Sequence, residues 1–496
     1  MSVQLIIPPL MNQKGDLFGS GVPYMSMEVP YLAAYLREKG LNVTIIDAFG
    51  EKPYQFTDAG ATHFLKGLRV EEVMARLDSK SEAIFLSSNS GFVSNYGIAY
   101  DYLLTLIKQI KAAIKAPLIM TGNFATIHFK DFLNAGADYV LLAEYELSSH
   151  QLLEALRAQD PRAIESIDGI AFLRNGKLVV RPKQHFLEDL DSLPFPAFDL
   201  LPLENYWRLK YSHGPYQGKY LPLLTSRGCP LGCTFCFVPG IWGRSWKIRS
   251  AKNVADELQH FVEKFNVRDF HVEDFNPTVR KDRIVELCKE IIQRNLKIHL
   301  KFAAGTKVET YDDVTLEWMA QAGVNYISIS PESGSPRMLK IMQKMFDHAY
   351  ALERIRTMTR LGIRSQACFV MGYPGETDED LRLTERYIER LADAGADEVT
   401  LFIMTPVPGS PASTEENWNY ENYEQLSFSP TWRKEYRKLA RLRVKWYVLF
   451  FTRKLFRRPI TSLKSLVNMF TGRFETKYEM TAYRIWDTYR RMYLGF

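Results

Sequence analysis

The chain has 496 residues, more than one hydrophobic core usually organises, so we expect two or three domains. Apolar residues make up 46% and charged residues 24%, which excludes a disordered, collagen-like or low-complexity chain. The net charge is +6, but residues 430–496 alone contain 17 Lys or Arg against four Asp or Glu. An anionic partner would therefore meet this C-terminal region.

The sequence shows neither a membrane span nor a secretory signal. The longest uninterrupted apolar run near the C-terminus, Trp446 to Phe451, is six residues long, whereas a bilayer needs roughly 20. The first residues lack a basic segment and a long apolar segment, and they resemble a buried strand instead of a signal peptide. Five cysteines are too few for a disulfide framework in a chain of this length. These features predict a cytoplasmic protein.

Residues 1–160 alternate short β-branched runs with stretches of helical period. The expected strands are 3–7, 43–47, 83–87, 118–121 and 139–143, and the clearest helices are 29–39 and 100–114. This alternation predicts a Rossmann-like, doubly wound parallel sheet, which binds ligands at the carboxyl ends of its strands. Small or polar residues stand at those ends: Asp47, Ser88, Gly122 and Asn123. They suit a phosphate-bearing or amide-bearing ligand, and they suit ordinary turns equally well.

A hairpin and a linker are expected over residues 161–205. The runs 170–173 and 178–180 flank Asn175-Gly176, a dipeptide that favours the positive-φ turn of a hairpin. The segment 190–199 contains two prolines and scattered aromatic residues, which is typical of an ordered linker. We therefore expect a domain boundary near this segment.

A second β/α series occupies residues 206–415. Six strands are expected at 221–226, 269–272, 298–303, 326–329, 364–370 and 398–403, with helices between them. Six units are too few for a complete eight-stranded TIM barrel. The pattern predicts a partial (β/α)6 TIM-like barrel, open on one side, with its chemistry at the carboxyl ends of the strands. A helical region is expected over 416–496.

Three cysteines, Cys229, Cys233 and Cys236, lie within eight residues in the loop after the first of these strands. Three thiolates from one loop leave a fourth metal position free, which suits a [4Fe-4S] cluster whose unique iron binds another molecule. The alternative is a structural zinc site. Such a site normally needs a fourth protein ligand, for which His213 is the nearest substitute.

The spacing Cys-x3-Cys-x2-Cys, with Phe235 before the last cysteine, resembles the radical S-adenosylmethionine (radical SAM) superfamily. The resemblance implies that the free iron chelates S-adenosylmethionine and that an electron from the cluster cleaves it to a 5'-deoxyadenosyl radical. It also implies an external electron donor such as flavodoxin or ferredoxin. The protein would supply placement and exclusion of water.

The same resemblance assigns Phe235 and residues at three further strand ends to S-adenosylmethionine. Glu273 and Asp274 stand where the family has an acidic pair that meets the methionine amino group, although solvated loop carboxylates would give the same pattern. The segment Ser330-Pro-Glu332-Ser333-Gly334 resembles the Glu-Ser-Gly element of the family. The segment Met371-Gly372-Tyr-Pro-Gly375-Glu376-Thr377 resembles the turn whose backbone approaches the adenine.

With the first domain included, residues 1–415 resemble the radical SAM proteins that carry a cobalamin-binding domain. The stretches 27–40 and 43–47 resemble the first helix and second strand of that domain, and 121–126 resembles part of its later half. The resemblance implies cobalamin at the strand ends, at Asp47, Ser88, Gly122 and Asn123. The Asp-x-His-x-x-Gly signature of histidine-ligated cobalamin is absent, so cobalt would have no histidine ligand. Degenerate domains that keep the fold and lose the cofactor also occur in this family.

Aromatic and aliphatic residues recur every three or four positions between Trp432 and Phe450, with Lys and Arg between them. Such a stripe is typical of a helix at a membrane interface. It would place the protein peripherally on the inner face of the membrane, near a lipid-like substrate. In the alternative interpretation, the same stripe is a helix face that packs against the open side of the barrel. A nucleic-acid partner is not expected, because the aromatic residues share one face instead of alternating with cations along a groove.

The resemblance implies an enzyme that makes a carbon radical on a small-molecule substrate and methylates it from methylcobalamin. The alternative reaction is radical ring closure, rearrangement or carbon–carbon bond formation without methyl transfer. The non-enzymatic alternative is a cluster-holding, lipid-associated binding protein. A radical methylthiotransferase acting on transfer RNA would usually carry more cysteines in the first domain, which has none.

Overall fold

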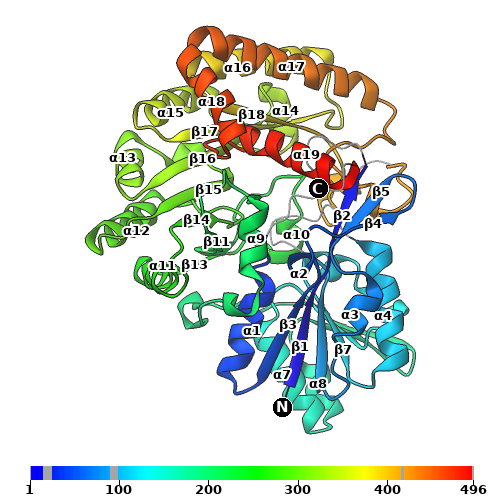
Figure 1. Ribbon diagram of the computed structural model, residues 1–496. Coiled ribbons are helices and arrows are strands. Elements are labelled where there is room, and N and C mark those ends of the chain that lie inside the picture. The colour runs from blue at the N-terminus through cyan, green and yellow to red at the C-terminus, as the bar shows by residue number, and fades with distance from the viewer. Residues whose placement is uncertain (1, 15–24, 90–98, 415–417, 494–496) are drawn as a thin grey trace. The chain divides into compact units, whose positions relative to one another are not determined.

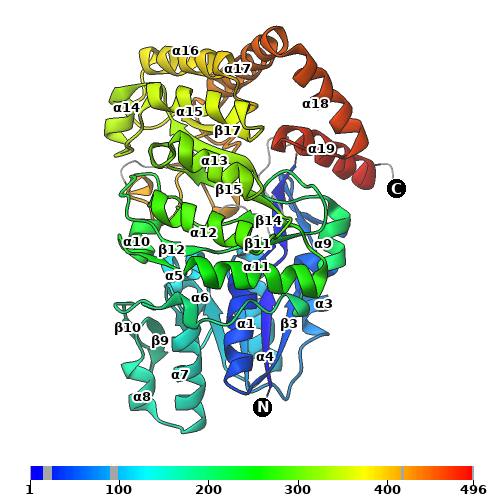
Figure 2. The same cartoon turned by 90° about the vertical axis from the view of Figure 1, so that its left-hand side faces the viewer.

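The computed structural model describes residues 2–14, 25–89, 99–414 and 418–493 (Figure 1). The described residues up to Leu209 form one compact unit, and those from Lys210 onward form a second. Each unit contains one large sheet that is mainly or wholly parallel, with helices packed beside it, as the turned view also shows (Figure 2).

The first unit contains a seven-stranded sheet in the order β10-β9-β8-β7-β6-β1-β3. Its strands are β1 Ser2–Ile7, β3 Asn42–Asp47, β6 Ala83–Ser87, β7 Leu118–Thr121, β8 Tyr139–Leu141, β9 Ile170–Arg174 and β10 Lys177–Arg181. The strands from β3 to β8 run parallel, which confirms the predicted doubly wound sheet. Strands β9 and β10 join its edge in antiparallel pairing. The predicted hairpin therefore belongs to this sheet and not to a separate linker.

A small antiparallel sheet in the order β2-β5-β4 also belongs to the first unit, and the sequence pattern does not predict it. Its strands are β2 Leu10–Gln13, β4 Phe56–Ala59 and β5 His63–Lys66. Each has only four residues, which is too short for a clear alternation. The helices of this unit are α1 Glu28–Glu38, α2 Ala48–Glu51, α3 Val70–Met74, α4 Tyr100–Ala113, α5 Asn123–Ile127, α6 Phe129–Ala135, α7 Glu146–Arg157, α8 Pro161–Ser166 and α9 Leu203–Leu209.

The second unit contains a six-stranded parallel sheet whose order in space, β11-β14-β15-β16-β17-β18, is also its order in the chain. The strands are β11 Tyr220–Leu223, β14 Asp269–Val272, β15 His299–Thr306, β16 Val324–Glu332, β17 Arg364–Met371 and β18 Glu398–Ile403. Within the described residues the first and last strands do not pair, so the sheet stays open. This confirms the predicted partial barrel.

Helices between these strands have the amphipathic pattern that a barrel requires. In α11, for example, Val254, Leu258 and Phe261 are buried at spacings of three and four, while Gln259 and Glu263 face solvent. The barrel helices are α10 Val238–Trp242, α11 Ala251–Phe265, α12 Lys281–Gln293, α13 Asp313–Gln321, α14 Pro336–Ile341, α15 His348–Arg360 and α16 Asp378–Ala394. A short hairpin, β12 Ser226–Gly228 with β13 Trp246–Ile248, brackets the cysteine loop.

Three helices, α17 Tyr436–Arg457, α18 Pro459–Thr471 and α19 Lys477–Tyr493, form the C-terminal region. Helix α17 packs against α16 and β18. Trp446 and Phe450, at the centre of the predicted stripe, are both 0% exposed, and the Trp446 ring N–H donates to Glu385 at 2.7 Å. The membrane-facing stripe predicted for this helix is therefore wrong, and the alternative of a docked face is correct.

The cations of α17 that flank the stripe also have partners on the barrel. Lys445 pairs with Glu385, and Arg453 and Arg457 pair with Asp393. Trp432, the first residue of the predicted stripe, precedes the helix and donates its ring N–H to the carbonyl of Gln425. Within the described ranges, no helix is long and apolar enough to cross a membrane.

Candidate cofactor site

The cysteine loop leaves the barrel through a turn that requires glycine. Gly228, directly before Cys229, has a φ of +80°, and a Cβ at this position would collide with the carbonyl oxygen of Ser245. Because Gly228 has no side chain, β12 can pair closely with β13 at this position, and the cysteine loop begins at the next residue. This fixes the place of all three cysteines at the carboxyl side of the barrel.

Loops that follow three other barrel strands hold the cysteine loop in place. The Thr234 N–H donates to the Met342 carbonyl (3.1 Å), and the Thr234 carbonyl accepts from the Ala412 N–H (2.8 Å). The Thr234 hydroxyl lies 2.7 Å from that of Tyr373. Phe235 packs against the cluster of Met338, Met342, Tyr373, Met404 and Ala412. The role of Phe235 in this structure is to anchor the loop, and its contact with S-adenosylmethionine stays a prediction.

The thiols themselves lie in an environment that disfavours their ionised form unless positive charge is supplied. Burial raises the pKa of Cys236 to about 12, and burial also raises that of Cys233. The side-chain amide of Asn276 is 3.8 Å from the sulfur of Cys229, within reach of a hydrogen bond to it. Soft thiol ligands with a donor beside one sulfur fit an iron–sulfur cluster.

Within the described residues, no three His, Cys, Asp or Glu side chains are gathered around a common point as the ligands of one metal ion would be. His213, the substitute ligand considered for zinc, is engaged elsewhere: its Nδ1 is 2.5 Å from the carboxylate of Glu273. The zinc alternative therefore lacks its fourth ligand, and the assignment of Cys229, Cys233 and Cys236 to a cluster stays a prediction.

Glu332 stands at a distortion of the sheet. The register between β16 and β17 shifts between Ile329 and Glu332, and Glu332 has a φ of +60°, unusual for a residue with a side chain. Its carboxylate is buried, and the Lys344 ammonium lies 3.5 Å from it. Burial raises the pKa of Glu332 although Lys344 acts in the opposite direction. A strained, buried carboxylate at a strand end is typical of a ligand site.

Lys344 and Asn276 are residues that the sequence reasoning missed. Lys344 follows α14 and interacts electrostatically with Glu332 and Cys233, both of which raise its pKa against the effect of burial. A largely buried cation beside three sulfurs would offset the negative charge of a thiolate-bound cluster. No motif marks Lys344, whereas Asn276 ends the strand-end segment that contains Glu273 and Asp274 but was given no role of its own.

The other residues assigned to S-adenosylmethionine have partners within the unit. Both oxygens of Asp274 accept hydrogen bonds from Thr225, at 2.7 Å each, and one also accepts from Ser226. The Ser333 hydroxyl lies 3.2 Å from that of Thr384. Glu273 and Asp274 are both buried, so the solvated-carboxylate alternative is wrong. Asp274 thus joins the end of β14 to the start of β12 and to the residue before it, whereas Glu273 shares its carboxylate with His213.

The two glycines after β17 differ in their surroundings. Both have a φ of +76°. A Cβ on Gly375 would meet nothing within 4 Å, whereas one on Gly372 would collide with Leu439 of α17. The Gly372 carbonyl accepts a hydrogen bond from Arg433 (3.0 Å) and its N–H donates to Glu376 (2.5 Å). Gly372 is thus required by the docked C-terminal region, and Gly375 is the more open of the two.

In the first unit the ends of β6 and β7 bring three predicted residues together. The Ser88 hydroxyl donates to Asn89 (2.7 Å), and the N–H groups of Phe124 and Ala125 donate to Asn89 and Ser88. Gly122 lies against this pair, and Asn123 is 3.4 Å from Glu28 of α1. Asp47 instead caps α2 through the Gly50 N–H (2.8 Å) and accepts from the Tyr206 hydroxyl (2.7 Å). Burial raises the pKa of Asp47 to about 6.

Comparisons with known proteins agree with this geometry. The family model described as Radical SAM superfamily matches residues 223–388. An uncharacterized methyltransferase of Pyrococcus horikoshii is 25% identical over 436 residues, which cover 88% of this chain and 86% of the relative. The anaerobic magnesium-protoporphyrin IX monomethyl ester cyclase of Cereibacter sphaeroides is 24% identical, over 85% of this chain and 66% of the relative.

A solved structure has the same fold over most of the chain. It is the radical S-adenosylmethionine methyltransferase TsrM from Kitasatospora setae, with cobalamin and a [4Fe-4S] cluster bound. The TM-score is 0.63 at 17% identity, and the match covers 84% of this chain and 74% of that chain.

Proposed function

The chain belongs to the radical SAM superfamily, and on that premise we propose that it is a cobalamin-dependent methyltransferase acting on a carbon atom of a small molecule. One observation carries the proposal. The Cys229–Cys236 loop stands at the carboxyl ends of an open six-stranded barrel, in a chain whose other unit is a doubly wound sheet. TsrM, which shares this fold, was solved with cobalamin and a cluster bound.

When bound, the cluster and S-adenosylmethionine supply a 5'-deoxyadenosyl radical and methylcobalamin supplies a methyl group. The contribution of the chain is placement. Cys229, Cys233 and Cys236 would hold the cluster, with Lys344 offsetting its charge. Glu332 would accept hydrogen bonds from the ribose hydroxyls or the methionine ammonium group, and the open backbone at Gly375 would lie against the adenine.

Cobalamin would occupy the ends of β6 and β7 in the first unit. Hydroxyl and amide groups of Ser88, Asn89 and Asn123 line this edge, and Gly122 keeps the backbone there free of a side chain. Because the histidine signature is absent, no protein nitrogen would coordinate cobalt. Electron paramagnetic resonance of the Co(II) state should then lack nitrogen superhyperfine splitting, and nitrogen splitting from a protein ligand would refute this part of the proposal.

Anaerobic reconstitution with iron, sulfide, cobalamin and S-adenosylmethionine tests the reaction class. A methyltransferase of this kind forms both 5'-deoxyadenosine and S-adenosylhomocysteine, because one S-adenosylmethionine is cleaved and another re-methylates cobalamin. An absence of reductive cleavage in cluster-loaded protein would contradict the proposal as a whole.

Radical ring closure without methyl transfer is the second candidate, and the relationship to the Cereibacter sphaeroides cyclase favours it. The same experiment separates the two, since ring closure forms no S-adenosylhomocysteine. A lipid-like substrate is not part of the proposal. The stripe on α17 was its support in the sequence, and that stripe is buried.

A further inference from the structure

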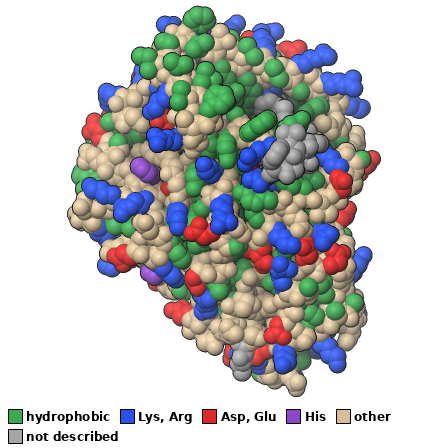
Figure 3. Space-filling view, viewed as in Figure 1, with side chains coloured by type: hydrophobic (Ala, Val, Ile, Leu, Met, Phe, Trp, Pro, Cys, Tyr) green, Lys and Arg blue, Asp and Glu red, His purple; other side chains and the backbone are tan. Residues whose placement is uncertain are grey.

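Helix α18 exposes an apolar stripe that nothing in the described chain covers. Ile460, Leu463, Val467 and Phe470 follow one another at spacings of three and four, which places them on one side of the helix. Ile460 is 84% exposed, Leu463 63% and Phe470 90%. Hydrophobic side chains gather on the upper part of the molecular surface, over α17 and α18, with Lys and Arg around them (Figure 3). Such a continuous exposed patch marks an interaction surface.

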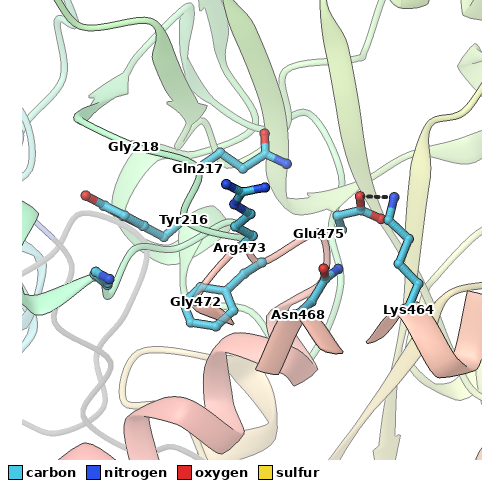
Figure 4. Close-up of a pocket in the computed structure, with 10 residues that line it drawn as sticks. Tyr216, Gln217, Gly218, Lys464, Asn468, Gly472, Arg473 and Glu475 are labelled. Carbon is cyan, nitrogen blue, oxygen red and sulfur yellow. Dashed lines mark hydrogen bonds and ion pairs between the residues drawn. The ribbon is translucent and has the colours of Figure 1, made fainter. Parts of the chain in front are cut away.

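A cationic cavity adjoins this stripe. It has a volume of about 540 Å³, and Lys210, Lys464 and Arg473 line it together with Tyr216, Asn468 and Glu475 (Figure 4). Lys464 lies four residues after Ile460, so it stands at the edge of the stripe and in the cavity wall at once.

The charges in the cavity wall leave a net positive site. The Glu475 carboxylate already pairs with Lys464 (2.6 Å) and with Arg364. Arg473 is exposed and makes no hydrogen bond or ion pair within the described part of the chain. From 436 to 474 the sequence contains no Asp or Glu. The cavity therefore suits an anion.

The stripe and the cavity lie away from the cofactor site. The Gln217 N–H donates to Asp269, the first residue of β14, and Glu475 pairs with Arg364, the first residue of β17. The cavity thus stands at the amino ends of the barrel strands, whereas the cysteine loop belongs to the carboxyl ends. Figure 2 shows α10, which follows the cysteine loop, and α18 on opposite sides of the second unit.

We propose that α18 and the adjoining cavity dock the protein on an anionic membrane surface. The apolar stripe would enter the boundary between headgroups and acyl chains, and Lys464 and Arg473 would meet lipid phosphates. A second copy of the chain is the less suitable occupant. A two-fold interface on the stripe would bring the cationic edges of two identical patches together. Docked in this way, the carboxyl ends of the barrel face away from the bilayer, so the substrate would enter from water.

Co-sedimentation of the full, cluster-loaded chain with lipid vesicles tests this proposal without reference to the reaction. We expect binding to mixed phosphatidylcholine–phosphatidylglycerol vesicles at low salt and little binding to pure phosphatidylcholine. The Lys464→Gln/Arg473→Gln variant should bind about 25-fold more weakly, since each surface cation contributes about fivefold. The Ile460→Ser/Phe470→Ser variant should lose the part of binding that persists at high salt.

Val314→Ser/Leu178→Ser, which removes exposed apolar side chains elsewhere, is the matched control and should bind like the wild type. The visible absorption of the cluster reports that each variant is folded. The proposal fails if the wild type ignores anionic vesicles, or if the control loses as much binding as the α18 variant. It also fails if inorganic phosphate at constant ionic strength releases the protein, which would indicate a free-anion site. A dimer that Ile460→Ser/Phe470→Ser dissociates would assign the stripe to a second copy instead.

Discussion

Both units gather their candidate ligand residues at the carboxyl ends of parallel strands, but the two ends differ in chemistry. In the second unit the end holds three thiols, of which Cys233 is buried, and the Glu332–Lys344 pair. In the first unit the ends of β6 and β7 hold hydroxyl, amide and backbone groups that hydrogen-bond to one another. The carboxyl ends of the barrel strands therefore hold charged groups at an energetic cost until a ligand compensates them. At the ends of β6 and β7 the polar groups already have hydrogen-bond partners.

The largest expected effect is the loss of the three thiols. Replacing Cys229, Cys233 and Cys236 together by Ala should abolish the iron–sulfur absorption and the formation of 5'-deoxyadenosine, because no soft ligands remain in the loop. Cys288→Ala is the control, since Cys288 is a buried thiol on α12 outside this loop. Reductive cleavage of S-adenosylmethionine by the triple variant would refute the assignment.

The next largest effect is expected at the ion pair between Lys344 and Glu332. Lys344→Met should destabilise the protein by about 3 to 5 kcal/mol, because it leaves Glu332 buried without its cation. The double variant Lys344→Met/Glu332→Gln should recover much of this loss. Chemical denaturation, followed by a spectroscopic signal from the barrel, measures the free energy of unfolding of both variants. Equal stability of the single and double variants would show that the pair is not coupled.

Much of this fold can be read from the sequence because its signals are local. Alternation and helical period mark every strand of both large sheets to within a few residues, and Asn175-Gly176 marks the hairpin turn. The cysteine spacing marks the loop in the same way. These features depend on neighbours in the chain, so tertiary packing has little chance to change them.

What the sequence leaves undecided is which surface covers a given stripe. The stripes on α17 and α18 have the same spacing and similar cations, yet Phe450 is buried and Phe470 is 90% exposed. The difference arises from acids on α16, where Glu385, Glu389 and Asp393 at four-residue spacing pair with cations of α17. That row of acids was the available signal. For Lys344 there was none, since it acts across β/α units, and for Asn276 the motif that ends at this residue does not show its contact with Cys229.

A pH dependence of intermediate size is expected at Asp47, the buried carboxyl at the end of β3. Its pKa of about 6 in the folded protein exceeds its ordinary value of 3.8, so the native state holds the proton more strongly. The contribution of Asp47 to the free energy of unfolding is therefore most favourable below about pH 4. It falls by about 3 kcal/mol as the pH rises to about 6. Rate-corrected hydrogen exchange of the β3 amides measures it, and Asp47→Asn should remove this dependence. An unchanged profile in that variant would assign the dependence to another group.

The smallest expected effect tests whether the residues at the ends of β6 and β7 are as closely packed as their hydrogen bonds indicate. Gly122 has a φ of +103°, and an added Cβ would lie 2.7 Å from the Ser88 hydroxyl and 2.8 Å from Asn89 Oδ1. Gly176 has a φ of +73° with nothing within 4 Å, so Gly176→Ala measures backbone strain alone, about 1 kcal/mol. Gly122→Ala should lower the free energy of unfolding by about 1 to 3 kcal/mol more than Gly176→Ala does. It should also reduce cobalamin uptake, because the collision displaces the residues that line this edge.

Hydrogen exchange of the β6 and β7 amides measures the loss of stability. Adding Ser88→Ala to Gly122→Ala should recover part of it, because one of the two close contacts is then removed. If Gly122→Ala and Gly176→Ala cost the same, the end of β7 has room for a side chain, and the contrast between a prepacked first unit and a ligand-dependent barrel does not hold.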